Sequence, residues 1–151
     1  MTAPTGFLAG LDAGHRTELL SLTREVRYPP GTRIFDEGEP ADAFWIIEEG
    51  AVALDVHVPG RVAPVIETLA PGDLLGWSWL FPPYEWHLGA RTLSPVTARR
   101  CDAAAVLTRC ETDPPFGYDL ARAVGGVVGQ RLKATRIRLL DLYGPHQGGT
   151  L

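Results

Sequence analysis

The chain has 151 residues, 45% of them apolar, and a formal net charge of −4 at pH 7. This length suits one domain with a sizeable core, and the mildly acidic charge argues against a broad surface for nucleic acid or anionic membranes. No apolar run could cross a bilayer and no signal peptide opens the chain, so we expect a cytoplasmic protein. In that compartment Cys101 and Cys110 are expected to be reduced structural thiols.

The chain begins with a helical pattern and continues into a glycine-punctuated β region. Leucines predict a short helix over residues 14–23. Short runs of β-type residues then predict strands over 33–35, 44–47, 52–58, 65–68 and 92–98. Glycines separate these runs at Gly31, Gly38, Gly50, Gly60, Gly72 and Gly76. Alternation over 52–58 predicts a half-buried strand with Asp55 on its exposed face. This pattern is typical of a sandwich or a closed roll.

Two helices are predicted after the β region. Asp102 is expected to cap a short helix over 103–107 through its carboxylate. Asp113 followed by proline starts a second helix, expected from about Pro115 to Tyr143 and stopped by the Gly-Pro pair at 144–145. We therefore predict one domain over residues 1–145 and a disordered tail over 146–151.

The order of these elements resembles the cyclic nucleotide-binding domains. Residues 28–42 look like that family's opening hairpin, residues 44–52 like its next pair of strands, and residues 69–76 like the approach to its phosphate-binding cassette. The resemblance covers nearly the whole chain. It implies a mainly β fold with flanking helices: a double-stranded β-helix, or jelly-roll-like β-roll, with a short N-terminal and a long C-terminal helix. It also implies a Crp/Fnr-like bacterial regulatory protein rather than an enzyme.

The expected ligand pocket departs from the family pattern. In members that bind a cyclic nucleotide, a glutamate after the glycine that resembles Gly76 holds the ribose, and a later arginine pairs with the phosphate. Here those positions hold Trp77 and Trp86. Pro82 and Pro83 lack the N–H groups that a phosphate cradle uses, and an indole offers one neutral donor instead of a cationic fork. We expect that the domain does not bind cyclic AMP in the usual way.

Two interpretations of the aromatic segment 77–86 stay open. Its rings fill the vacated pocket as core, or they line a site for a flat or apolar ligand or for a partner protein. The candidate site residues are Gly76, Trp77, Ser78, Trp79, Tyr84, Trp86, His87 and Arg91, the last as a cation for an acidic ligand or as an ordinary surface residue. The favoured function is a stand-alone sensor domain that acts through a non-standard ligand or a protein partner. Cyclic nucleotide binding by an altered pocket is an alternative.

Signals for catalysis are weak. The four histidines are isolated along the chain, at His15, His57, His87 and His146. A cupin-like metal-dependent enzyme is therefore a minor alternative, because His57 and His87 would need a third ligand. Ser78 lies in no nucleophile elbow, and no phosphate-binding loop or dinucleotide fingerprint occurs. We expect no catalytic residue, no metal and no cofactor.

The C-terminal helix is predicted to form a homodimer. Apolar and small residues follow one another at spacings of three and four: Ala121, Val124, Val128, Leu132, Thr135, Leu139 and Leu142. The family resemblance suggests the same seam; the alternative is that this stripe packs on the chain's own roll. The basic residues Arg131, Lys133, Arg136 and Arg138 are expected on a solvated face. The winged helix-turn-helix of the best-known bacterial relatives does not follow, so no DNA-binding domain is expected.

Overall fold

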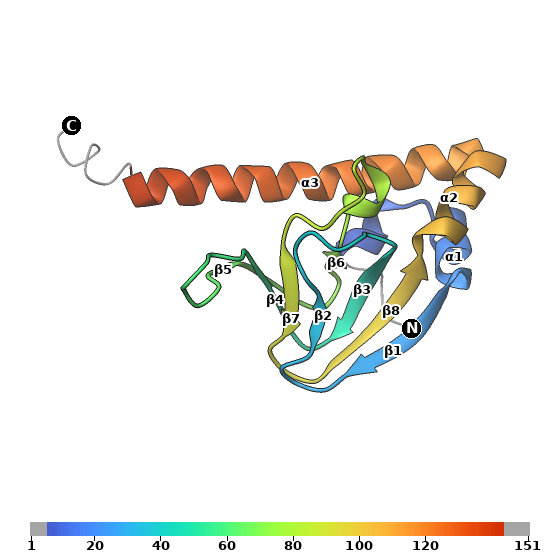
Figure 1. The fold of residues 1–151 in the computed structure, drawn as a ribbon. Coiled ribbons are helices and arrows are strands. Elements are labelled where there is room, and N and C mark those ends of the chain that lie inside the picture. The colour runs from blue at the N-terminus through green and yellow to red at the C-terminus, as the bar shows by residue number, and fades with distance from the viewer. Residues whose placement is uncertain (1–5, 144–151) are drawn as a thin grey trace.

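The computed structural model describes residues 6–143 as a β-roll covered by helices (Figure 1). The helical elements are η1 (Gly6–Gly10), α1 (Ala13–Ser21), η2 (Ser78–Leu80), α2 (Ala103–Thr112) and α3 (Pro114–Tyr143). The strands are β1 (Thr23–Tyr28), β2 (Arg33–Phe35), β3 (Ala43–Glu49), β4 (Val52–Asp55), β5 (Val65–Leu69), β6 (Leu74–Leu75), β7 (Gly89–Thr92) and β8 (Val96–Asp102). The predicted fold class is confirmed. The predicted stop of the last helix after Tyr143 and the tail over 146–151 lie outside the described residues.

The strands form two antiparallel sheets of four strands each. Their orders are β1-β8-β3-β6 and β2-β7-β4-β5, so strands distant in sequence are neighbours. Trp45 on β3 lies opposite Arg100 on β8, and Leu54 on β4 lies opposite Ala90 on β7. The inner faces bury a continuous core that includes Phe44. The two sheets therefore form one closed roll, and helix α3 packs on its outside.

Two strand predictions are wrong at their ends. The sequence predicts one strand over 92–98, but the chain turns through Leu93–Pro95 and gives two strands, β7 and β8. This turn is fixed by the Leu93 N–H, which donates to Ala51 O at 2.9 Å, and by Ser94 Oγ, which accepts from the Ala51 N–H at 3.0 Å. The predicted strand over 52–58 ends at Asp55, and β1 has no counterpart among the predicted strands.

Asp55 is buried rather than exposed, which corrects the predicted alternation on β4. Its carboxylate accepts two hydrogen bonds from Arg33, from Nη1 at 2.6 Å and from Nη2 at 2.8 Å. Gly89 makes room for this pair, since a Cβ there would collide with the guanidinium of Arg33. The charge of Asp55 can be buried because a bidentate arginine compensates it.

The helices after the roll begin close to the predicted positions. Helix α2 starts at Ala103, but the predicted cap is wrong, because the Asp102 carboxylate pairs with Arg100 and not with the helix N–H groups. The Ala103 N–H donates instead to Asp42 O at 2.9 Å. Helix α3 crosses the roll and continues beyond it (Figure 1). Like the other helices between residues 6 and 143, it lacks an apolar stretch that could span a bilayer.

Candidate functional site

A cavity of about 300 Å³ opens between the roll, the η2 segment and helix α3. Its lining residues are Phe35, Leu54, Ile66, Glu67, Gly76, Trp77, Ser78, Trp86, His87, Leu88, Val128, Arg131, Leu132 and Thr135. The structure therefore gathers Gly76, Trp77, Ser78, Trp86 and His87 from the predicted site around one space. Most other lining residues are apolar, so the interior suits a largely apolar guest.

Trp86 forms part of the inner wall and is 5% exposed. Its ring stacks on Phe35 with centroids 4.0 Å apart and lies 6.2 Å from Trp45. One of the two interpretations of the aromatic segment makes this ring part of the core, but its ring partners come from β2 and β3 instead of that segment. Gly76 permits this position, because its φ is +96° and a Cβ there would lie 2.7 Å from the Trp86 ring. Trp86 thus fills one part of the pocket and bounds the rest.

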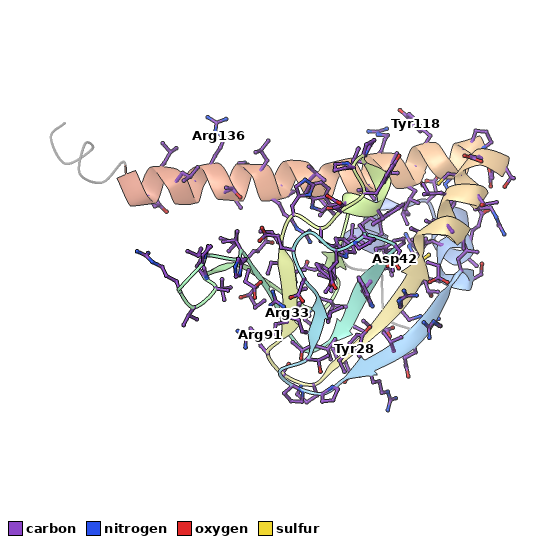
Figure 2. The ribbon with its side chains drawn as sticks, in the orientation of Figure 1. Tyr28, Arg33, Asp42, Arg91, Tyr118 and Arg136 are labelled. Atoms are coloured by element: carbon purple, nitrogen blue, oxygen red, sulfur yellow. The ribbon has the colours of Figure 1, made fainter. Side chains whose placement is uncertain are left out.

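Three of the predicted site residues lie outside the cavity. Trp79 is core, since its ring stacks on Phe44 at 4.8 Å and its Nε1 donates to Gly76 O at 3.0 Å. Tyr84 is 47% exposed. Arg91 is exposed on β7, opposite Arg33, on a part of the roll remote from α3 (Figure 2). These residues do not face a ligand in the cavity.

Trp77, Ser78 and His87 form a polar corner of the cavity. The indole of Trp77 stacks on the His87 ring with centroids 5.4 Å apart. Ser78 Oγ lies 3.0 Å from His87 Nδ1 at hydrogen-bond distance. Between residues 6 and 143, no carboxylate hydrogen-bonds His87, so the third member of a catalytic triad is missing there. The corner can offer hydrogen bonds to a ligand.

Helix α3 supplies residues that the sequence analysis did not assign to the site. Val128, Leu132 and Thr135 line the cavity, although they were predicted for a dimer seam. Arg131, predicted on a solvated face, has a side chain that is only 16% exposed. Burial lowers the pKa of this guanidinium. The spacing of Arg131 in the sequence could have assigned it to the site. It is three residues after Val128 and four before Thr135, which places all three on one helical face.

Comparison with known proteins decides the family. The model of the cyclic nucleotide-binding domain matches residues 25–113. The chain belongs to this family. A "CRP-like cAMP-activated global transcriptional regulator" of Mycobacterium tuberculosis is 28% identical over 140 residues, which are 93% of this chain and 61% of that relative. The chain therefore spans less than two thirds of the length of this curated relative.

Solved structures agree with this family membership. A putative cyclic nucleotide-binding protein from Geobacter metallireducens has a TM-score of 0.74 at 26% identity, covering 87% of this chain and 99% of the other. The c-di-GMP-responsive global regulator CLP of Xanthomonas campestris has a TM-score of 0.78 at 20% identity, covering 87% and 65%. The second likeness shows a shared fold alone.

The structure divides the stripe predicted as the dimer seam of this cyclic nucleotide-binding domain. Val124 is fully buried in the chain's own core and cannot reach a second copy, which corrects that part of the prediction. Leu132, by contrast, is 63% exposed and Leu139 is also exposed. Tyr118 and Arg136 point away from the roll on the same helix (Figure 2). The side chain of Leu142 lies outside the described residues. Leu132 also lines the cavity and therefore lies at its rim, whereas the exposed side of α3 carries Tyr118, Arg136 and Leu139.

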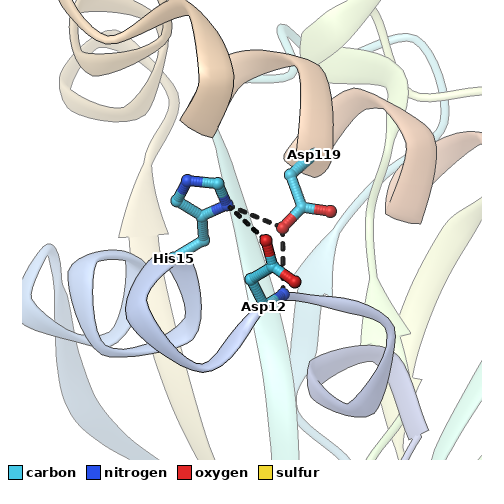
Figure 3. A group of neighbouring side chains, drawn as sticks. All are labelled: Asp12, His15 and Asp119. Atoms are coloured by element: carbon cyan, nitrogen blue, oxygen red, sulfur yellow. Dashed lines mark hydrogen bonds and ion pairs between the residues drawn. The ribbon is translucent and has the colours of Figure 1, made fainter.

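A second polar cluster joins α1 to α3 (Figure 3). Asp119 Oδ2 lies 2.8 Å from His15 Nδ1 and accepts the Asp12 N–H at 3.0 Å. The hydrogen bond to Asp119 raises the pKa of His15. The Asp12 N–H, followed by His15, lowers the pKa of Asp119. Among the described residues, this is the set with spacing compatible with a metal, and it does not include the His57 or His87 of the cupin-like alternative.

The two cysteines of the domain are free thiols. Burial raises the pKa of Cys101 to about 12 and also raises that of Cys110. Both thiols are therefore protonated at neutral pH and are weak nucleophiles.

Proposed function

We propose that this domain is a regulatory sensor whose ligand is not a cyclic nucleotide bound in the usual way. The observation that carries the proposal is the cavity between the roll and α3. Trp77 and Trp86 line this cavity, and they stand at the sequence positions to which the family resemblance assigns a ribose-binding glutamate and a phosphate-binding arginine. Indoles favour a flat, apolar guest and offer no charge to a phosphate.

The surroundings of the cavity also disfavour a cyclic phosphate in the cassette. Arg91, the cation nearest to the segment in sequence, is exposed on β7 and does not line the cavity. Pro82 and Pro83 remove two backbone donors. The arginine that lines the cavity, Arg131, comes from helix α3 and not from the cassette, so a cyclic phosphate held by the cassette would lose its hydration without compensation. Binding of a cyclic nucleotide by an altered route is therefore the alternative that the test below must exclude.

We assign the domain no catalytic role. The curated relative is named as a transcriptional regulator, which supports regulation over catalysis. The Ser78–His87 pair resembles a nucleophile with a base, but it has no orienting carboxylate within the described residues. We infer that this pair helps to position a ligand.

We also infer that the domain works as a homodimer in the cytoplasm. The support is a pair of exposed apolar side chains on α3: Leu132, at the rim of the cavity, and Leu139. At Gly125 and Gly129 of the same helix, an added methyl group would meet no described atom within 4 Å beyond the helix's own backbone, so a second helix could approach closely there. Through this helix a ligand event in the cavity could reach a partner.

Calorimetry with cyclic AMP and cyclic GMP tests the proposed function. We expect no saturable heat with either nucleotide, and a micromolar or tighter Kd would overturn the proposal. A thermal-shift panel of metabolites should instead identify a ligand that raises the unfolding midpoint, because it binds only the folded state. Trp77→Ala should weaken that stabilisation, whereas Arg91→Ala, outside the cavity, should leave it unchanged.

A further inference from the structure

We infer that the ligand of this cavity is a small aromatic monocarboxylate whose acid group pairs with Arg131 of helix α3. This inference rests on the proposed function, since it takes the cavity to be the sensor site. It adds the chemical class of the ligand and the residue that recognises its charge.

The body of the ligand follows from the size and lining of the cavity. A volume of about 300 Å³ corresponds to about ten water molecules and stands at the lower end of ligand pockets. Trp77 and Trp86 present aromatic rings to this space, and Leu54, Ile66 and Leu88 complete apolar walls. One aromatic ring or a fused pair fits such a site by offset or edge-to-face packing.

The charge of the ligand follows from Arg131. Its side chain is mostly buried, and within residues 6–143 its polar contacts are Leu74 O, which accepts a hydrogen bond from Nη2, and Glu67. Nη1 has no hydrogen-bond partner there. No buried side-chain nitrogen in this part of the chain lacks a partner, so Nη1 is accessible, and Arg131 lines both this cavity and a second pocket between η1, β5 and α3. A guanidinium with free donors beside an apolar cavity is suited to a carboxylate.

The existing counter-ion of Arg131 is loose enough to be displaced. Glu67 Oε2 lies 3.7 Å from Arg131 Nε, beyond hydrogen-bond distance, and the Glu67 side chain is 34% exposed on β5. A ligand carboxylate can therefore take the guanidinium while Glu67 turns toward water. A doubly charged phosphate would be repelled more strongly by Glu67 and by Asp73, which also acts on Arg131. One negative charge fits this balance best.

Phenylacetate and phenylacetamide test this inference, because they differ in charge and hardly in shape. Naphthylacetate and its amide form a larger pair. Binding can be followed by quenching of tryptophan fluorescence, since Trp77 and Trp86 line the cavity, and by calorimetry. We expect the acid to bind at least about tenfold more tightly than the amide, as for a hydrogen bond to a charged group. Arg131→Gln should abolish this preference and retain amide binding.

Two further variants complete the design. Glu67→Gln removes the competing carboxylate and should increase the affinity for the acid but not for the amide. Arg122→Gln is the matched control, because Arg122 is an exposed arginine on the same helix that does not line this cavity. It should leave the acid-to-amide ratio unchanged.

Equal binding of acid and amide, or an acid preference that survives Arg131→Gln, would overturn the monocarboxylate inference and leave the proposed sensor function standing. Absence of saturable binding by all four probes at millimolar concentration would also overturn it. Micromolar binding of cyclic AMP would overturn the proposed function itself. If Arg131→Gln does not fold, Glu67→Gln decides: no gain in acid affinity contradicts the pairing with Arg131.

Discussion

Replacing Trp86 with alanine tests the inner wall of the cavity. A buried tryptophan removes about 150–250 Å² from water, which corresponds to about 4–6 kcal/mol at about 25 cal/mol per Å². Alanine retains part of this, and truncations of large buried aromatics cost about 3–5 kcal/mol. Trp86 is 5% exposed and stacked on Phe35, so we expect that full range. The melting temperature should fall by about 6–20 °C.

The contact between Trp86 and Gly76 makes this prediction sharper. In Gly76→Ala the new Cβ lies 2.7 Å from the Trp86 ring and must adopt a φ of +96°. We expect a cost from the backbone of about 1–2 kcal/mol and a further cost from the collision with the ring. When Trp86 is already alanine, the collision disappears and the backbone cost stays. The double variant should therefore be more stable than the sum of the two single changes predicts.

Urea unfolding of the four proteins in this cycle supplies the free energies. Tyr84→Ala is a suitable control, because that ring is 47% exposed and its loss should change stability by less than about 1 kcal/mol. A loss below about 1 kcal/mol for Trp86→Ala would show that the ring is not packed as described. Strict additivity in the cycle would refute the close contact with Gly76.

Three other changes have defined outcomes. Arg33→Met should cost about 2–4 kcal/mol in urea unfolding, because it leaves a buried carboxylate without its cation, discounted for the partial exposure of Arg33. The raised pKa of His15 means that its stabilisation is full below its ordinary value of 6.5 and fades as pH rises through the raised value. The lowered pKa of Asp119 means that the stabilisation from its carboxylate is present above pH 3.8 and is lost on acidification. The difference in the free energy of unfolding between the wild type and His15→Gln should therefore be largest in mildly acidic solution and not at alkaline pH. Light scattering should give the mass of a dimer for the wild type and of a monomer for the double variant Leu132→Glu with Leu139→Glu. A monomeric wild type at tens of micromolar would contradict the dimer, and a dimer that survives both changes would contradict the predicted seam.

Local signals explain how much of the fold the sequence predicts. Glycines at tight turns and short β-type runs between them locate most strands, and the predicted strand over 33–35 has the bounds of β2. Asp113 followed by proline likewise places the start of α3 within one residue. Such features depend on neighbours in the chain, so they can be recognised without knowing the fold.

The features that the sequence did not predict depend on distant partners. Asp55 is buried because Arg33, from another strand, reaches it. Arg131 lines the cavity with its side chain mostly buried, and its partners Glu67 and Leu74 come from β5 and β6. Trp86 could be assigned to the pocket, but its stacking on Phe35 follows from the pairing of the roll. Charge and ring contacts of this kind become visible only once the strands are in place.

The loop that carries Trp86 is anchored by its main chain. The Gly38 N–H donates to Trp86 O at 2.8 Å, the Trp86 N–H donates to Glu39 O at 3.0 Å, and the Ala41 N–H donates to Tyr84 O at 2.8 Å. These bonds do not depend on which side chain the loop presents. Evolution could therefore exchange the side chain at position 86 and keep the loop in place, so that a roll of this kind can acquire a new chemical specificity without having to rebuild its architecture.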